Sequence, residues 1–455
     1  MHLQLVVIAF VAFGAAVASA QVTNSDTAYQ HGMQAYEQGH YAEAETFFRD
    51  ALDQAKEFGE LDPRFESALK SLAAVLESEH RHTEAGSFYQ QALALEEQTL
   101  GPDHPELARL LNNLGTIRER EGNYSQAEPL YKRALTIWEK APEANHRDLA
   151  ITLCNLAHMY KVEGRYPEAD SLLQRALLVQ ERIYGPEHLK VGLTLSEFAS
   201  VCQSEGKQKE ALTFYKRAEA ILEKVLGTEH PDVAALLSNV AIFHQNQGRY
   251  AVAEPLLQRS LSIQERAHGS EAPQVATVLS ELAALRYFEQ EYAEAESLYK
   301  RALAILEKQS GSKTLEFAIS LQNLGVIYVE QHRYEDARAI FERASTIIER
   351  LLGPEHLELG KSLTRLALAE ITLGHDANAE LACQRALSIL EKTSPPDYPN
   401  LIDALKTYAL LLLRTKRKAE AELVQTRVMV YRARWENRNK KSTKEPSSSS
   451  SLTNQ

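Results

Sequence analysis

The stretch LGPDHPELARLLNNLGTIREREGNYSQAEPLYKRALTIWEK, residues 100–140, contains two apolar patterns of helical period on either side of a break at Gly122. The second pattern runs through Tyr124, Ala127 and Tyr131 at steps of three and four residues, which places these side chains on one face of a helix. The first pattern is built in the same way from Leu107, Leu111, Leu114 and Gly115. The stretch therefore predicts a helix hairpin whose small residues let the two helices approach closely.

This hairpin returns along most of the chain at a fixed distance. The small residue of the second pattern recurs once after 41 residues and then always after 42, at Ala44, Ala85, Ala127, Ala169, Ala211, Ala253, Ala295, Ala337, Ala379 and Ala421. The small residue of the first pattern also recurs in steps of 42, at Ala73, Gly115, Ala157, Ala199, Ala241, Ala283, Gly325, Ala367 and Ala409. About ten hairpins therefore fill residues 21–438, and such a period predicts an all-α solenoid whose core forms between stacked neighbours.

Short connections of similar sequence join the hairpins, among them LGPDHP at 100–105, YGPEHL at 184–189 and LGPEHL at 352–357. Glycine there can adopt the positive φ that ends a helix, and Pro-Asp or Pro-Glu suits a turn before the next one. Five histidines recur in these connections: His104, His146, His188, His230 and His356. Equivalent residues of adjacent repeats lie roughly 8–10 Å apart, whereas zinc ligands lie about 2 Å from one ion. We therefore expect turn or cap residues and no metal site.

The motifs LNNLG at 111–115, YSQAEPLYKRAL at 124–135 and LGPDHP at 100–105 resemble the 42-residue tetratricopeptide repeats of kinesin light chains. The resemblance implies a right-handed α-solenoid of about ten such hairpins, in which the first helices line a concave groove that binds extended peptides. The chain departs from kinesin light chains because it lacks their long N-terminal heptad coiled coil and begins with an apparent export signal. A role in attaching cargo to a motor is therefore not expected, and an interaction scaffold is.

On the side of the first helices opposite the packing stripe, one column contains four asparagines in nine units. It reads Ser71, Asn113, Asn155, Glu197, Asn239, Glu281, Asn323, Arg365 and Thr407. An asparagine amide offers both a donor and an acceptor, so several in a row can hold an extended backbone, at about 0.5–1.5 kcal/mol for each hydrogen bond. The alternative is that these asparagines are solvated or bridge neighbouring repeats.

Two further columns complete the predicted groove. The column that contains Asn112 is polar and mostly small, which suits the floor of a binding site. The other changes from polar to apolar along the array: Glu119, Lys161, Gln203, Gln245, Tyr287, Val329, Ile371 and Leu413. With Phe288 beside Tyr287, this column predicts that repeats seven to ten bury apolar side chains, either of a partner or of the C-terminal segment. The alternative is that these residues belong to the core between helices.

No motif for catalysis or cofactor binding is present in residues 1–455: a phosphate-cradling Gly-rich loop, H-E-x-x-H, C-x-x-C and G-x-S-x-G are all missing. Glu-rich surfaces such as residues 119–121 are interpreted as solvated helix faces. We therefore expect no enzymatic activity, no metal and no cofactor. An enzyme whose catalytic pair comes from distant repeats remains an alternative.

Residues 1–20, MHLQLVVIAFVAFGAAVASA, hold an uncharged apolar run that ends in a small-x-small pattern at 18–20, which is typical of a signal-peptidase site. We expect a signal peptide, cleavage before Gln21, and export to the periplasm or the outside. The basic residues that usually precede such a run are missing, and a buried or frayed terminal helix is the alternative. The chain contains three cysteines, Cys154, Cys202 and Cys383, and they occur in unrelated sequence contexts. We therefore expect them to be packing residues and not to form disulfides.

The formal net charge of −12 argues against a nucleic-acid partner, and nothing after residue 20 resembles a membrane span. The last hairpin is basic, with Arg414, Lys416, Arg417, Lys418, Arg427, Arg432, Arg434 and Arg438. A terminal repeat must present a polar face to water. The alternative is contact with an acidic partner or with the acidic body of another molecule. Residues 439–455 are Ser-rich and poor in apolar side chains, which predicts a disordered tail.

The sequence thus predicts a non-enzymatic scaffold that binds a protein or an extended peptide in a concave groove. The predicted binding residues are Asn112, Asn113, Asn155, Asn239, Asn323, Gln203, Gln245, Tyr287 and Phe288. A structural protein that forms homo-oligomers through its apolar C-terminal repeats is the alternative from a different class.

Overall fold

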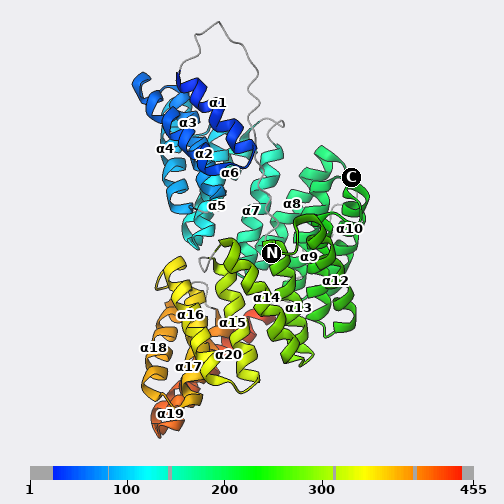
Figure 1. The fold of residues 1–455 in the computed structure, drawn as a ribbon, viewed down its shortest axis with the longest axis vertical. Coiled ribbons are helices and arrows are strands. Elements are labelled where there is room, and N and C mark those ends of the chain that lie inside the picture. Colours follow the sequence, from blue (N-terminus) through cyan, green and yellow to red (C-terminus); the bar gives the residue numbers. More distant parts are fainter. Residues whose placement is uncertain (1–23, 80, 142–145, 311–313, 393–396, 443–455) are drawn as a thin grey trace. The chain divides into compact units, whose positions relative to one another are not determined.

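The computed structural model of the protein describes residues 24–79, 81–141, 146–310, 314–392 and 397–442. This part of the chain folds into α-helices and one short 3-10 helix, and it contains no strand. The predicted signal peptide lies outside the described residues, and so does the predicted tail from residue 443 on. The chain is an all-α repeat solenoid, as the sequence predicts (Figure 1).

The helices alternate between the first and the second helix of successive hairpins, and they fall into two compact units divided within α10. The N-terminal unit ends at Ile221, and the C-terminal unit begins at Leu222. The N-terminal unit contains α1 (Asn24–Glu37), α2 (Tyr41–Ala55), η1 (Lys56–Phe58), α3 (Pro63–Ser78), α4 (His82–Leu100), α5 (Pro105–Arg120), α6 (Tyr124–Lys140), α7 (His146–Val162), α8 (Tyr166–Tyr184), α9 (Leu189–Ser204) and most of α10 (Gln208–Leu226). The C-terminal unit contains α11 (Pro231–Gln245), α12 (Tyr250–His268), α13 (Pro273–Phe288), α14 (Tyr292–Ser310), α15 (Leu315–Glu330), α16 (Tyr334–Leu352), α17 (Leu357–Leu373), α18 (Asp376–Lys392), α19 (Tyr398–Arg414) and α20 (Lys418–Ser442).

The connections end one helix and cap the next. Gly101 has a φ of 86°, a conformation that side chains with a Cβ rarely adopt, and it stops α4. Four of the recurring histidines are N-cap residues whose Nδ1 accepts a hydrogen bond from the backbone N–H two residues later, at 3.1–3.3 Å: His104, His188, His230 and His356. This satisfies one of the free N–H groups of the helix start. The predicted cap role is confirmed for these four, while the side chain of His146 lies outside the described residues.

Close packing within a hairpin depends on its small residues. A Cβ at Gly115 would lie 2.8 Å from Cε1 of Tyr131, and a Cβ at Gly325 would lie 2.5 Å from Cε1 of Phe341. The aromatic ring of the second helix therefore rests directly on the backbone of the first. Pro129 lies inside α6, beyond its first turn, where it removes an intrahelical hydrogen bond.

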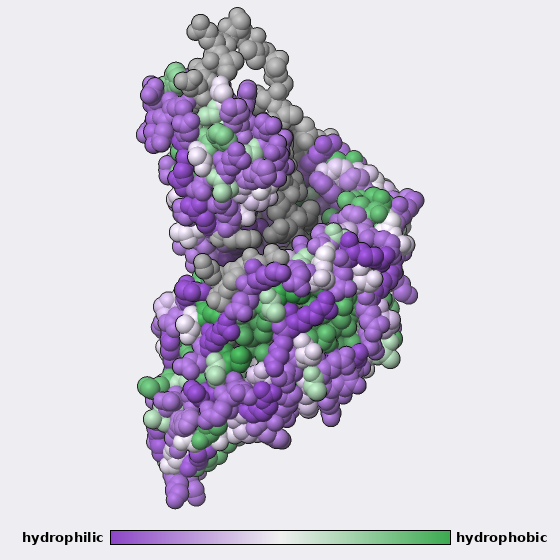
Figure 2. Space-filling view, viewed as in Figure 1, coloured by the Kyte–Doolittle hydropathy of each residue, from purple (hydrophilic) through white to green (hydrophobic). Residues whose placement is uncertain are grey.

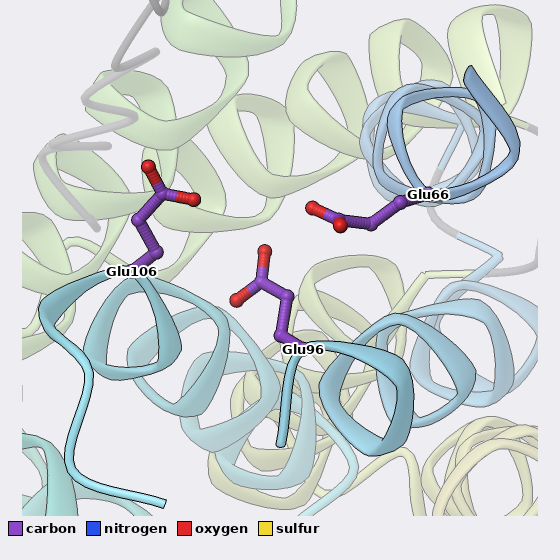
Figure 3. A group of neighbouring side chains, drawn as sticks. All are labelled: Glu66, Glu96 and Glu106. Atoms are coloured by element: carbon purple, nitrogen blue, oxygen red, sulfur yellow. The ribbon is translucent and has the colours of Figure 1, made fainter. Parts of the chain in front are cut away.

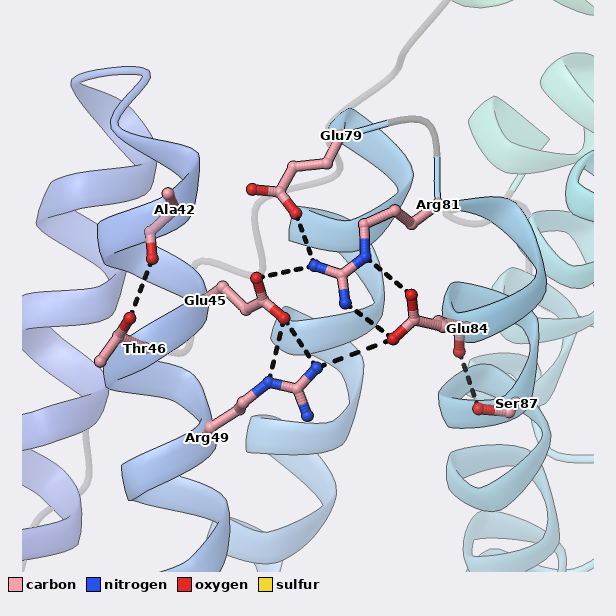
Figure 4. Close-up of polar contacts among 8 residues, drawn as sticks. All are labelled: Ala42, Glu45, Thr46, Arg49, Glu79, Arg81, Glu84 and Ser87. Atoms are coloured by element: carbon pink, nitrogen blue, oxygen red, sulfur yellow. Dashed lines mark hydrogen bonds and ion pairs between the residues drawn. The ribbon is translucent and has the colours of Figure 1, made fainter. Parts of the chain in front are cut away.

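Neighbouring repeats are joined by ion pairs between successive second helices. In Figure 4, Arg81 at the start of α4 reaches back to Glu45 of α2 at 2.8 Å and also contacts Glu84 at 2.7 Å. A second series joins an arginine to the glutamate 36 residues before it: Arg133–Glu97, Arg175–Glu139, Arg217–Glu181, Arg259–Glu223, Arg301–Glu265, Arg343–Glu307, Arg385–Glu349 and Arg427–Glu391. Each exposed pair contributes only about 0–1 kcal/mol. Their repetition favours one stacking register over others.

Within each unit, the backbones of successive first helices approach one another, as α5 and α7 do in one unit and α17 and α19 in the other. Successive second helices do not approach to the same extent anywhere in the described ranges. Each unit therefore curves toward its first helices. The side of the first helices that faces away from the second helices is the concave surface of this curve. We call it the first-helix face.

Candidate functional site

The predicted asparagines lie on the first helices and are half-buried. Asn112, Asn113 and Asn155 belong to the N-terminal unit, and Asn239 and Asn323 belong to the C-terminal unit. The structure thus places the predicted residues on the first-helix face of two separate units.

Several of these asparagines have partners within the fold. Asn155 donates from Nδ2 to Oδ1 of Asn112 in the preceding repeat, at 3.1 Å. Asn113 acts to lower the pKa of Tyr89 in the preceding repeat, and Asn323 acts in the same way on Tyr299, although burial raises the pKa of both tyrosines. An amide group has two donors and two acceptor lone pairs, so one internal bond leaves capacity for a ligand. Bridging of neighbouring repeats, the alternative raised by the sequence, therefore occurs at Asn155.

Gln203 and Gln245 differ in their surroundings. Gln203 accepts a hydrogen bond from the Tyr215 hydroxyl at 3.2 Å. Gln245 is half-buried, and its Oε1 has no hydrogen-bond partner within the described part of the chain. Because this oxygen is buried, a ligand can reach it only if the Gln245 side chain changes its conformation.

Tyr287 and Phe288 belong to an aromatic cluster at the end of α13. Phe288 stacks on Tyr250 at a centroid distance of 6.1 Å, and Tyr287 lies 6.0 Å from Tyr292. Burial raises the pKa of Tyr287, and the charge of Glu330 adds to this effect. Phe288 keeps about half of its surface exposed. The cluster offers apolar surface, but its rings are partly engaged with one another.

The apolar column that begins at Tyr287 is not uniform. Val329 is half-buried and Leu413 is exposed, but Ile371 is buried among Ala379 and Leu411. Ile371 is therefore a core residue and unavailable to a partner, which corrects the predicted column at that position.

A better apolar stripe lies one turn nearer the helix starts, and the sequence analysis missed it. On α15, Ile319 and Val326 are seven residues apart with Asn323 between them, so the three share one face. The equivalent residues of the adjoining first helices continue the stripe: Ile242, Ala284, Leu368 and Leu410. Ile319, Leu368 and Leu410 are 40%, 39% and 47% exposed. We call Ile242, Ala284, Ile319, Val326, Leu368 and Leu410 the apolar stripe. The same 42-residue spacing that revealed the asparagines could have found it.

Figure 2 shows apolar surface gathered over the part of the C-terminal unit where Figure 1 places α13, α14 and α15. The same position in the N-terminal unit is occupied by Ala74, Thr116, His158 and Ser200. Single exposed apolar residues are common, whereas a contiguous stripe of them is typical of an interaction site. The first-helix face of the C-terminal unit is therefore the strongest candidate for binding a protein segment.

The first-helix face of the N-terminal unit carries a charged network instead. His158 lies 3.1 Å from Glu197, which also pairs with Lys161 at 2.8 Å. Burial acts to raise the pKa of Glu197, but Lys161 and His158 outweigh it and hold that pKa below its usual range. Glu119 accepts a hydrogen bond from Tyr131 at 2.8 Å, and burial raises its pKa. Glu119 is therefore not the solvated residue that the sequence suggested.

Three glutamates from α3, α4 and α5 approach one another in the N-terminal unit (Figure 3). One carboxylate oxygen from each of Glu66, Glu96 and Glu106 lies within 4.8 Å of the others. Lys70 contacts Glu66 at 2.5 Å and Glu96 at 3.0 Å, so an ammonium group already supplies positive charge. A divalent cation prefers such oxygens but would have to displace Lys70. That the protein binds no metal stays a prediction.

Glu96 is expected to make stability depend on pH. It is 1% exposed, and burial raises its pKa to about 7, although Lys70 acts in the opposite direction. Between the unfolded value of about 4.3 and pH 7 the folded chain holds a proton that the unfolded chain has lost. The contribution of Glu96 to the free energy of unfolding therefore falls as the pH rises through that window, by at most about 1.4 kcal/mol for each pH unit.

Substituting Glu96→Gln removes this titration. Urea unfolding at pH 5 and pH 7.5 should show the variant gaining stability relative to the unmodified protein as the pH rises. Glu97→Gln, which changes the next residue, serves as the control and should follow the unmodified protein. Parallel pH profiles for Glu96→Gln and the unmodified protein would contradict the assignment.

The three cysteines are free and buried, as predicted, and burial raises the pKa of Cys154 to about 11 and those of Cys202 and Cys383 to about 12. Such thiols are protonated near neutral pH, which suits packing residues rather than nucleophiles. Among the described helices, none has both the length and the apolar character needed to cross a bilayer.

A family model described as tetratricopeptide repeat matches residues 64–140, 148–224, 232–308 and 316–392, which together make up more than half of the chain. The search of curated proteins found no match. Among solved structures, the TPR-like repeats of a kinesin light chain from Podosopora anserina are 26% identical, over 44% of this chain and 94% of that one, with a TM-score of 0.36. A Rap protein complexed with competence and sporulation factor is 14% identical, over 90% and 98% of the two chains, with a TM-score of 0.51. The apo form of the quorum sensor NprR from B. thuringiensis is 12% identical, over 71% and 87%, with a TM-score of 0.54.

Proposed function

Because the chain belongs to the tetratricopeptide repeat family, whose fold is typical of protein-interaction scaffolds, we propose that it binds a segment of another protein along the first-helix face of its C-terminal unit. The observation that carries this proposal is the apolar stripe, of which Ile319, Leu368 and Leu410 are exposed and the other three residues are half-buried. Burying such surface stabilises a complex by about 25 cal/mol per Å² before the costs of association.

The asparagines beside the stripe complement it. Asn323 lies between Ile319 and Val326 on α15, and Asn239 holds the equivalent position on α11. We propose that their amides hold the backbone of an extended segment while the stripe contacts its apolar side chains. The similar fold of the Rap protein complexed with competence and sporulation factor supports the proposal at the level of fold.

Affinity capture with the full chain from its native compartment, followed by peptide mapping and titration of the captured segment, tests this function. Replacing Asn239 and Asn323 together by alanine should weaken binding of that segment. Because amides on these helices also bond within the fold, as Asn155 does, we expect a loss of roughly 0.5–1.5 kcal/mol of stability for each bond removed. Binding should therefore be measured well below the unfolding temperature of the variant.

The matched control for this experiment is a serine or glutamine substitution at the same two positions, which retains hydrogen-bonding groups. Partial recovery of affinity in the glutamine variant supports backbone capture. Unchanged affinity in the folded alanine variant would remove the asparagines from the site.

Export of the protein remains part of the proposal. It rests on the apolar run and small-x-small pattern of residues 1–20. Fractionation of the source cells, with N-terminal sequencing of the mature chain, tests it: Gln21 as the first residue is the expected result.

A further inference from the structure

The last hairpin leaves an open cavity of about 370 Å³ between α19 and α20. Its apolar wall is formed by Leu410, Leu413, Val428 and Met429, and Lys406 and Arg432 also line it. This outer face shares Leu410 with the apolar stripe but differs from it because it includes the second helix of the repeat.

In the preceding repeat, the equivalent face is covered by α19, the first helix of the repeat that follows it. Met429 is 71% exposed, whereas Leu387, one period earlier, is 7% exposed because it packs in one core with Leu401 and Leu405 of α19. Leu413 is 47% exposed, whereas Ile371, its equivalent, is 4% exposed and contacts Leu411 of α19. The cavity therefore lies where the first helix of a following repeat would pack, and its shape suits an amphipathic helix.

The positive charge of this face indicates which charged side chains a docked helix carries. Arg432 stands one period after Leu390, which is fully buried under α19. Residues 398–438 contain nine Lys and Arg and four Asp and Glu, a net charge of 9 − 4 = +5 in a chain of net charge −12. Lys406 already pairs with Asp403 at 3.1 Å, whereas Arg432 is exposed. A helix that covers Leu413 and Met429 must therefore also bring a carboxylate to Arg432, because a cation left without a partner in an interface is costly.

Other occupants fit less well. Residues 443–455 hold a single large apolar residue, Leu452, and cannot supply an apolar stripe. Residues 1–20 are apolar but contain no Asp or Glu. A second copy that met this face with its own C-terminal hairpin would oppose two basic surfaces.

The first hairpin of a second copy has a suitable charge, since residues 24–60 carry eight acidic and two basic residues, 2 − 8 = −6. However, the exposed residues of α1 are polar, namely Thr27, Gln30, His31, Gln34 and Glu37. It therefore offers no apolar stripe to fill the cavity.

We propose that the outer face of α19 and α20 docks an amphipathic helix of another protein, whose apolar residues fill the cavity and whose Asp or Glu side chains pair with Arg432. The docked helix takes the place of the first helix of a following repeat. This second surface goes beyond the proposed function of the apolar stripe.

The test uses two synthetic helical peptides of the length of α19. Both carry the apolar residues with which α19 packs on α18, and their remaining positions are Glu in one peptide and Lys in the other. Fluorescence anisotropy with the full chain should show the Glu peptide binding at least about tenfold more tightly than the Lys peptide. Met429→Asp should weaken the Glu peptide about tenfold, and Arg432→Glu should reverse the preference between the two peptides.

The matched control is Leu423→Asp, which changes an equally exposed apolar residue of α20 that does not line the cavity. It should leave the binding of both peptides unchanged. Ile319→Glu, in the apolar stripe, should also leave it unchanged, so failure here is distinguishable from failure of the proposed function. Circular dichroism verifies that each variant is folded.

Several results would overturn the proposal. Equal affinity for the two peptides, or no binding at about 100 µM, would remove the site. Self-association of the chain that Met429→Asp abolishes would assign the face to a second copy. Binding that appears only after deletion of residues 1–20 would assign it to that segment.

Discussion

Replacing Phe341 by alanine will lower the free energy of unfolding by about 3–5 kcal/mol. Phe341 is buried between Ala337 and Ala344 on its own helix, and its ring rests on the backbone of Gly325 in the first helix of the same hairpin. Alanine leaves a cavity that the rigid helix pair cannot close. Because each repeat is stabilised mainly by its neighbours, the loss should weaken the stacking of α15 and α16 with the adjoining hairpins.

Denaturant unfolding followed by circular dichroism measures this effect. Phe288→Ala is the matched control, because it removes the same side chain from an exposed position in the same unit. We expect it to change stability by less than about 1 kcal/mol. Similar losses in the two variants would mean that the hairpin interior is not packed as described.

The second large effect concerns binding. Changing Ile319 and Leu368 together to glutamate should reduce the affinity for the captured protein segment by at least about tenfold, with little change in stability. Both side chains are exposed on the first-helix face, so the glutamates remain solvated in the free protein. In the complex they would have to lose that hydration against apolar groups, which costs at least about 1–3 kcal/mol for each polar group without a partner.

Leu178→Glu combined with Leu381→Glu is the matched control. These leucines are even more exposed, but they lie on the second helices α8 and α18. Isothermal titration calorimetry of the captured segment with both double variants separates the two surfaces. Equal losses of affinity, or a loss in the control alone, would place binding away from the first-helix face.

Much of the fold follows from local pattern. The steps of three and four residues from Tyr124 to Tyr131 specify a helix face, and the 42-residue interval specifies stacked hairpins. The cap role of His104 and its equivalents was also predictable, because capping depends on residues adjacent in the chain.

The site was only partly predictable. The spacing placed Asn113, Asn155 and their equivalents on the correct helices, but it could not show that Asn155 bonds Asn112. The apolar stripe had the same spacing and escaped notice because its members vary from alanine to leucine. The interval of 36 residues between Glu97 and Arg133 was likewise visible, but its meaning depended on two second helices lying side by side.

The sequence alone determined that this chain is a stack of helix hairpins, because helical period and repeat length are properties of residues near one another in the chain. Only the tertiary structure decided which members of a column are free. Ile371 and Leu413 occupy equivalent positions, yet one is core and the other is surface. The reason is that burial depends on the repeat stacked against a side chain, and the last hairpin has no following repeat among the described residues.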